Sequence, residues 1–110
     1  MAKIEMVNII IYLDKQFEVQ QLVEELLKAR LAAKISVDKD NLSYFIEAGE
    51  LVTKTRTVLT LQTKALHFSA IDTFLQARFG EQVPLCSVPI TQVNKRFDQF
   101  IRENTTFEND

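Results

Sequence analysis

The chain has 110 residues, of which 46% are hydrophobic and 25% are charged, as expected for one soluble globular domain. It carries 13 Lys and Arg against 15 Asp and Glu, a net charge of −2. This balance argues against a dedicated nucleic-acid-binding protein, because such proteins carry a strong basic excess. The longest apolar run, residues 7–13, is too short to span a bilayer. We therefore expect neither nucleic acid nor a membrane among its partners.

Cysteine and glycine are both scarce. A single cysteine, Cys86, excludes an intrachain disulfide and fits a reducing compartment. The first residues, MAKIEM, contain no hydrophobic signal region, so we expect a cytoplasmic protein. The two glycines, Gly49 and Gly80, are too few for a phosphate-binding glycine loop. One His and one Cys are likewise too few for a closed structural zinc site.

The first part of the chain predicts a strand and a helix. The β-branched run at residues 6–13 is typical of a strand that is covered on both faces or central in a sheet. Asp14 stands where it would cap a following helix, which we expect to run to about Ala32. Apolar residues with helical spacing form the inner face of that helix; they are Val19, Leu22, Val23, Leu26 and Leu27.

The middle of the chain predicts a long β-hairpin. Residues 34–46 form its first strand, which the polar residues 38–41 (DKDN) interrupt as a bulge or loop would, and residues 51–63 form its second. Residues 47–50 (EAGE) indicate the turn, where Gly49 can adopt a positive φ. Strands of about 13 residues reach ~43 Å, whereas a domain of this size has a radius of gyration of ~13 Å. The end of the hairpin should therefore overhang the core.

The last part of the chain predicts a helix, a short strand and another helix. Residues 64–79 have helical spacing and precede Gly80, which is suited to end a helix. Residues 83–90 contain two prolines and indicate an edge strand, after which Asn94 can cap a short helix. We expect residues from about 104 to 110 to fray. The apolar residues of the two helices are Phe68, Ile71, Phe74, Leu75, Phe97, Phe100 and Ile101.

The order of these elements predicts a single α+β domain over residues 1–110. It is the ferredoxin-like βαββαβ plan with a C-terminal helix added, in which two helices cover one face of a four-stranded antiparallel sheet. Apolar residues lie on both sides of the strands, so the other face needs a cover. Together with the exposed edges of the overhanging hairpin, this predicts a closed homo-oligomer in which the open sheet faces meet.

Several segments carry a family resemblance that covers about residues 9–103. ARLAAKISV, LSYFIEAGEL, LTLQTK, VPLCSVPI and NKRFDQFIRE resemble the CutA family, the divalent-cation-tolerance proteins. The resemblance implies a ferredoxin-like trimer with a long hairpin, related in fold to the PII signalling proteins. It also implies a non-enzymatic role in divalent ion tolerance. The alternative is a PII-like sensor that binds a small anionic ligand or a nucleotide in a cleft between subunits.

The sequence departs from the family pattern at polar positions. The family often has cysteine at Lys34, asparagine at Ser36 and lysine at Gln62, and it has histidine and tyrosine at the positions of Phe79 and Glu81. Its Trp-rich strand end is here replaced by residues 44–47. Because most ligand positions are replaced, we expect no metal cofactor, although the resemblance implies divalent metal.

If the protein is a PII-like sensor, basic residues near the sheet would line its intersubunit cleft. A guanidinium or ammonium there can bind an anion such as a phosphate, or else form a salt bridge to the next subunit. We expect Lys34 at the start of its strand, at the rim of an interface and outside the dry core. The predicted cleft comprises Lys34, Gln62, Lys64 and Glu81, and the other basic candidates are Arg30, Lys54 and Arg56.

The candidate metal ligands are His67, Cys86, Asp38 and Asp40. We interpret Cys86 as a small buried hydrophobe and His67 as a solvated residue in the first turn of a helix. The D-x-D at residues 38–40 is compatible with a hard cation and equally with a bulge. No catalytic residue is predicted, because the serines have only His67 as a possible base; they are Ser36, Ser43, Ser69 and Ser87.

Overall fold

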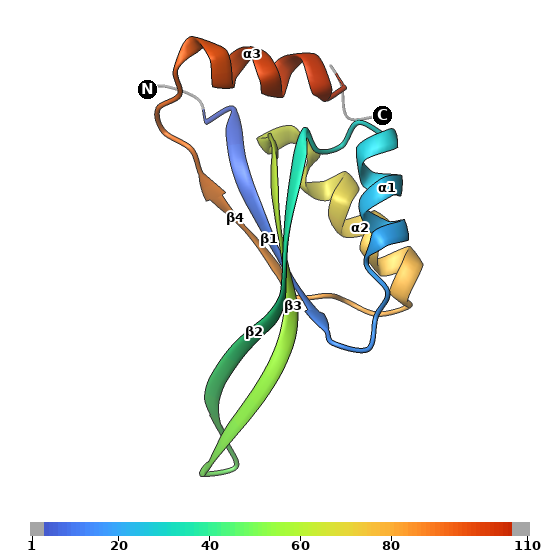
Figure 1. Ribbon diagram of the computed structural model, residues 1–110, viewed down its shortest axis with the longest axis vertical. Helices are drawn as coiled ribbons and strands as arrows, with labels where there is room; N and C mark the ends of the chain where they lie inside the picture. The colour runs from blue at the N-terminus through green and yellow to red at the C-terminus, as the bar shows by residue number, and fades with distance from the viewer. Residues whose placement is uncertain (1–3, 107–110) are drawn as a thin grey trace.

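A four-stranded antiparallel sheet with strand order β2-β3-β1-β4 organises the chain, whose computed structural model describes residues 4–106 (Figure 1). This order of strands and helices confirms the ferredoxin-like α+β prediction. The elements are β1 (Met6–Asp14), α1 (Gln20–Lys28), β2 (Lys34–Glu47), β3 (Glu50–Lys64), a 3₁₀ turn (Ala65–His67), α2 (Phe68–Phe79), β4 (Leu85–Pro89) and α3 (Lys95–Asn104).

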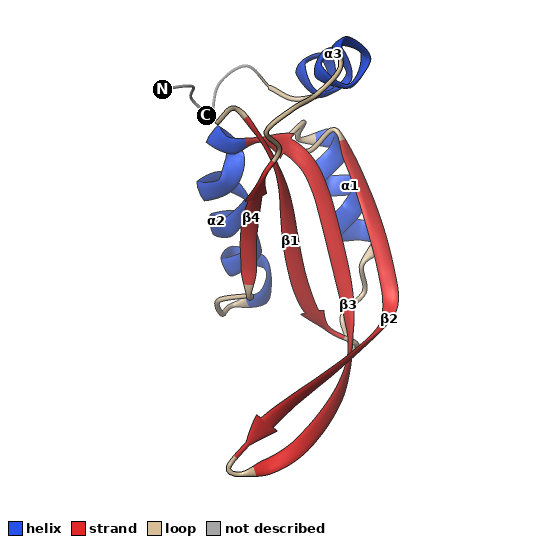
Figure 2. Cartoon of the chain, turned by 90° about the vertical axis from the view of Figure 1, so that its left-hand side faces the viewer, coloured by secondary structure: helices blue, strands red, loops and turns tan. Residues whose placement is uncertain are grey.

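The core lies between one face of the sheet and the helices α1 and α2. Burial alternates along β1, because every second side chain points toward the helices. The buried apolar cluster consists of Val7, Ile9, Ile11, Leu13, Val19, Leu22, Leu26, Ala32, Leu59, Leu61, Ile71, Leu75 and Val83. Figure 2 shows the sheet from its other side, where the strands lie in front of α1 and α2. The apolar run of β1 thus belongs to a central strand that the helices of this chain cover on one face.

Helix α1 is shorter than predicted at both ends. It begins at Gln20, after Val19, which provides no side-chain cap. Asp14 instead ends β1, and its carboxylate forms an ion pair with Lys54 at 3.1 Å, so the predicted cap is wrong. The helix ends at Lys28 because Arg30 has a left-handed φ of 59°. The N–H groups of residues 30 and 31 bond back to the carbonyls of residues 27 and 26, the pattern of a Schellman motif.

The hairpin overhangs the core, as its length predicts. β1 pairs with β3 only as far as Asp14↔Arg56, so the hairpin beyond this point is a two-stranded ribbon. Ala48 and Gly49 form its turn with φ values of 52° and 80°, and a type I′ turn requires positive φ at both positions. The overhang makes the molecule 46 Å long, with a radius of gyration of 15.1 Å (Figure 1).

The second half of the chain follows the prediction with one shift. Helix α2 begins at Phe68 rather than at Lys64, because β3 extends to Lys64 and a 3₁₀ turn follows it. Gly80 closes α2 with a φ of 72°, and its N–H donates to the carbonyl of Gln76 at 2.8 Å. Asn94 caps α3 by accepting the N–H of Phe97 at 2.9 Å. The predicted end of α2 at Gly80 and the predicted cap of α3 at Asn94 are therefore confirmed.

The end of α3 is held against the α1–β2 corner. The N–H of Thr106 donates to the carbonyl of Arg30 at 2.9 Å, and the Arg30 guanidinium donates to the carbonyl of Glu103 at 2.6 Å. Thr105 is buried. These residues were expected to fray, whereas residues 107–110 of the predicted tail lie outside the described range. Within residues 4–106, no helix has the length and apolar character needed to cross a membrane.

Leu75 tests the contribution of the core. Its side chain is fully buried, whereas Leu66 on the neighbouring 3₁₀ turn is 45% exposed. We expect Leu75→Ala to lower the free energy of unfolding by about 2–5 kcal/mol, from lost burial and the cavity left behind. Urea-induced unfolding gives this value. Leu66→Ala is the matched control and should change it by about 0.5 kcal/mol or less; equal losses in the two variants would contradict the assigned core.

Candidate functional site

The four residues predicted to line an intersubunit cleft lie in two separate places. Lys34 is exposed at the first residue of β2, as expected, and pairs with Gln62 of β3. Lys64 ends β3 at the same end of the sheet. Glu81 lies at the opposite end of β1, in a pocket that also contains Asp14. One chain does not assemble this cleft, which therefore stays a prediction about neighbouring subunits.

Lys64 and His67 bind the segment that follows α3. Lys64 Nζ donates to the carbonyl of Thr106 at 2.8 Å, and His67 Nε2 donates to the same oxygen at 3.1 Å. Lys64 is 8% exposed and His67 is fully buried. The prediction of a solvated His67 is therefore wrong, because the 3₁₀ turn before α2 points the imidazole inward. Both side chains have a structural role in holding the end of the chain.

The ammonium group of Lys64 is in an unfavourable electrostatic environment. Burial lowers its pKa below 10.5, and the positive charges of Arg102 and Arg30 lower it further. Glu5 opposes this effect, because a negative charge stabilises the ammonium form. Lys64 is thus a lysine whose charged form the folded protein destabilises.

Cys86 is exposed, so its interpretation as a buried hydrophobe is wrong. It lies in the edge strand β4 opposite Ile10, and Ile10 belongs to the half-buried set of β1 side chains that points away from the helices. The apolar neighbours of Cys86 in sequence gave no information about which face of the sheet it occupies. Its thiol therefore lies on the open face of the sheet.

Asp38 and Asp40 mark a bulge in β2, where the pairing register with β3 shifts. Asp38 accepts hydrogen bonds from the backbone N–H of Asp40 at 3.4 Å and from the side-chain amide of Asn41 at 3.2 Å. Asp40 forms an ion pair with Lys15. Throughout residues 4–106, no three His, Cys, Asp or Glu side chains are grouped to hold a metal ion. The four candidate ligands therefore do not converge within this chain.

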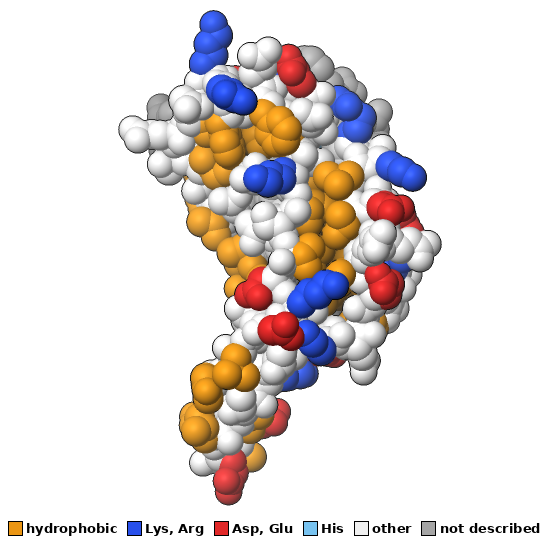
Figure 3. Space-filling model, in the orientation of Figure 1, with side chains coloured by type: hydrophobic (Ala, Val, Ile, Leu, Met, Phe, Trp, Pro, Cys, Tyr) orange, Lys and Arg blue, Asp and Glu red, His pale blue; other side chains and the backbone are white. Residues whose placement is uncertain are grey.

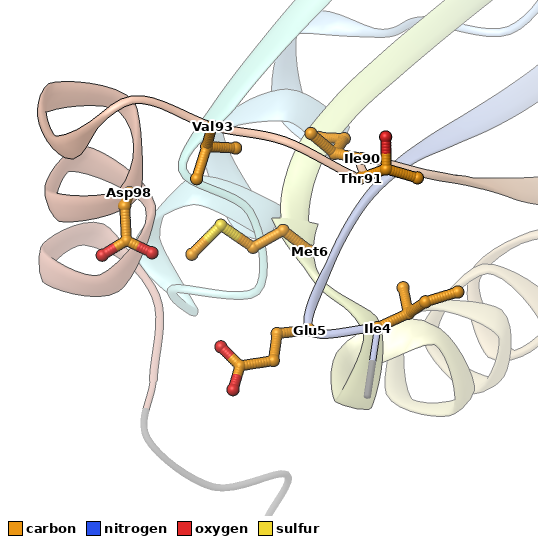
Figure 4. Close-up of a pocket in the computed structure, with 7 residues that line it drawn as sticks. All are labelled: Ile4, Glu5, Met6, Ile90, Thr91, Val93 and Asp98. Carbon is orange, nitrogen blue, oxygen red and sulfur yellow. The ribbon is translucent and has the colours of Figure 1, made fainter. Parts of the chain in front are cut away.

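A cavity of about 330 Å³ lies between the N-terminal end of β1, the segment after β4 and α3 (Figure 4). The side chains of Met6 and Val93 approach each other in it, and the carboxylates of Glu5 and Asp98 lie at the same side (Figure 4). Ile4, Ile90 and Thr91 complete the lining. Sequence reasoning missed this cavity because its two halves lie at opposite ends of the sequence.

Arg102 pairs with both carboxylates that line this cavity. It forms ion pairs with Glu5 and with Asp98, one turn earlier in α3. The hydrogen bonds to Glu5 and Asp98 raise the pKa of the guanidinium above its usual value. Because Arg102 engages both carboxylates, these groups attach α3 to β1 and are not free to bind a cation.

A second cavity, of about 200 Å³, lies where the hairpin leaves the sheet. Arg56 lines it from β3, and its Nε is buried without a hydrogen-bond partner. Asp14, its cross-strand neighbour, pairs with Lys54 instead. Among residues 4–106, no acceptor reaches this Nε. The other lining residues are Tyr12, Leu13, Phe17, Glu81, Gln82, Val83 and Pro84.

Comparison with known proteins identifies the family. The family model of the CutA1 divalent ion tolerance protein matches residues 7–104. The chain belongs to this family. No curated protein sequence matches the chain.

Solved CutA1 structures share the fold along almost the whole chain. CutA1 from Oryza sativa is 14% identical with a TM-score of 0.83, and the match covers 96% of this chain and 97% of that one. The divalent cation tolerance protein Cut A1 from Thermus thermophilus is 20% identical with a TM-score of 0.79, over 92% and 99%. The periplasmic divalent cation tolerance protein CutA from Archaeoglobus fulgidus is 22% identical with a TM-score of 0.77, over 90% and 97%.

Within this CutA1 fold, most of the departures from the family pattern lie on the surface, whereas Phe79 packs against the core. Lys34, Ser36 and Glu81 are exposed, and Gln62 is half-buried on the face of the sheet away from the helices. Lys34, Ser36 and Glu81 are therefore positioned to contact other molecules.

The lowered pKa of Lys64 makes stability depend on pH. Between the folded pKa and 10.5, the unfolded chain binds more protons than the folded one, so stability should rise with pH in this range. We expect the native protein to gain stability relative to Lys64→Met as pH rises from about 8 toward 10.5, as measured by urea unfolding. Lys28→Met, at an exposed lysine, should leave the pH profile unchanged. Parallel profiles for native protein and Lys64→Met would contradict the effect of burial.

Proposed function

We propose that this CutA1-family chain acts as a homotrimer in divalent ion tolerance, through binding or scaffolding rather than catalysis. Family membership supports the link to divalent ion tolerance. The proposal of a non-enzymatic role rests on the family resemblance, and the buried position of His67 supports it, because His67 is the only histidine of the sequence that could serve the serines as a base. We also propose a cytoplasmic location, which the single cysteine supports; the Archaeoglobus relative is described as periplasmic.

The exposed apolar face of the hairpin supports self-association. Its side chains lie on a two-stranded ribbon that no part of the described chain covers, and Figure 3 shows hydrophobic side chains along it. An isolated ribbon of this kind is marginally stable in water. This hydrophobic hairpin face consists of Leu42, Tyr44, Ile46 and Leu51, which are 52%, 65%, 66% and 69% exposed.

Two unpaired strand edges add to this argument. β2 and β4 are the outer strands of the sheet, so each leaves one row of backbone groups unpaired within the described chain. Because the two edges are different surfaces, a contact between them is head-to-tail, and such contacts close into a ring when the rotation between subunits allows it. The resemblance to the CutA family gives the number of subunits as three.

The hydrophobic hairpin face provides the test of the oligomer. We expect Ile46→Asp combined with Leu51→Asp to dissociate the trimer, because burying two carboxylates in an apolar interface is costly. Light scattering during size-exclusion chromatography measures the mass. The matched control is Leu66→Asp, an exposed leucine away from the hairpin, which should leave the mass unchanged. A native protein that runs as a stable monomer would refute self-association.

The metal role needs its own measurement. Since the candidate ligands do not converge within one chain, we expect the native protein to bind copper, zinc or cobalt no tighter than millimolar. Calorimetry with each metal tests this expectation. Binding at micromolar concentration would show that neighbouring subunits assemble a site, and loss of that binding in Cys86→Ser or His67→Gln would identify its ligands.

The second candidate is a PII-like sensor that binds a small anionic ligand. The four cleft residues predicted from the sequence do not support it within one chain, because Glu81 lies far from the other three. The observation that favours it is Arg56, whose buried Nε has no partner in the described part of the chain.

A further inference from the structure

Arg56 lies at the point where the hairpin leaves the sheet. It pairs with Asp14 of β1, at the last position of that ladder, and with Asn41 of β2, the first residue after the bulge. Its backbone is therefore fixed by strands on both sides. Buried polar groups in folded proteins are almost always hydrogen-bonded, and leaving a charged donor unsatisfied costs more than ~1–3 kcal/mol. The Nε has no acceptor within the described residues, and the guanidinium side chain lines the cavity at this junction.

The nearest carboxylate in the ladder does not provide that acceptor. Asp14 lies across from Arg56, but its Oδ1 lies 3.1 Å from Lys54 Nζ. The charge of Asp14 is therefore largely compensated by Lys54. Arg56 keeps a fork of N–H donors, which matches the two oxygens of a carboxylate or phosphate.

The rest of the cavity limits the ligand. Its volume of about 200 Å³ is below the ~300–1,000 Å³ typical of sites for drug-sized ligands, so a nucleotide does not fit inside one chain. The exposed carboxylate of Glu81 lines the same cavity and repels a dianion while accepting hydrogen bonds from an ammonium group. Tyr12 offers a hydroxyl, and Phe17 and Pro84 offer apolar contact.

We propose that this cavity binds a small zwitterion of amino-acid size, with its carboxylate on Arg56 and its ammonium toward Glu81. The opposite charges of these two residues match the opposite charges of the ligand. Arg56 and Glu81 both line this cavity within one chain. It goes beyond the proposed function by naming the ligand class and the residues that select it.

Calorimetry on the full-length protein with the standard L-amino acids tests the proposal. We expect at least one of them to bind, and its amide (without the carboxylate) and its des-amino analogue (without the ammonium) to bind at least tenfold more weakly. Arg56→Met should lower the affinity at least tenfold, and Arg56→Lys should also weaken it because the fork is lost. The matched control is Arg96→Met at an exposed arginine, which should leave the affinity unchanged.

Glu81 provides an independent test. Glu81→Gln should reduce the preference for the amino acid over its des-amino analogue, whereas Glu24→Gln, at an exposed glutamate, should not. If inorganic phosphate or the des-amino analogue binds as tightly as the amino acid, the zwitterion proposal is wrong. No response to any amino acid would also overturn it.

The competing occupant is a carboxylate from a second copy of this chain. In that case Arg56→Met would reduce the oligomer mass in light scattering, and no amino acid would bind. We expect the mass to stay the same in this variant. A native monomer that still binds an amino acid would refute the proposed trimer but would support the zwitterion site. Failure of the trimer proposal and failure of the site proposal can therefore be distinguished.

Discussion

The end of the β1–β3 ladder at Asp14↔Arg56 is the constraint on which the rest of the structure depends. Up to this point each strand contributes side chains to the core beneath α1 and α2. Beyond it β2 and β3 have no third strand and no helix, so their apolar side chains remain in water within one chain. The core alone therefore does not account for the length of the hairpin, and the hydrophobic hairpin face is the surface that the proposed self-association would cover.

The same junction concentrates charge. Asp14, Lys54 and Arg56 lie within two neighbouring strands. Asp40, in the bulge of β2, forms an ion pair with Lys15, the residue after β1. Two of the three basic groups have a carboxylate partner, and Arg56 has none in the described chain. A ribbon that must leave the sheet at a defined angle is fixed here by ion pairs, and the remaining guanidinium is the group available for recognition.

The sequence predicted the fold well because its strongest signals are local. The β-branched run of β1, the turn at Gly49, the closure of α2 by Gly80 and the cap at Asn94 each depend on a few adjacent residues. The end of α1 was missed because Arg30 adopts the left-handed conformation that usually marks a glycine or asparagine. The sequence has no glycine or asparagine at this position, and the Schellman hydrogen bonds end the helix without one.

The candidate site was less predictable because it depends on which face a side chain occupies. A 3₁₀ turn of three residues was enough to bury His67, and the position of β4 at the sheet edge was enough to expose Cys86. Arg56 was one of several basic candidates in the sequence. Its buried Nε without a partner distinguishes it from the others, together with the pairing of Asp14 with Lys54, and no local pattern encodes either feature.

The position of β1 also has a consequence for the order of assembly. β1 is made first, yet one of its neighbours is β4, with Val7 paired to Pro89 near the other end of the chain. Closing so long a loop costs conformational entropy that a local hairpin does not. Synthesis proceeds from the N-terminus. β2 and β3 can therefore pair before β4 has been made, and one edge of β1 stays unpaired until then. The central strand of the finished sheet is thus an unprotected edge for most of the time the chain is being made.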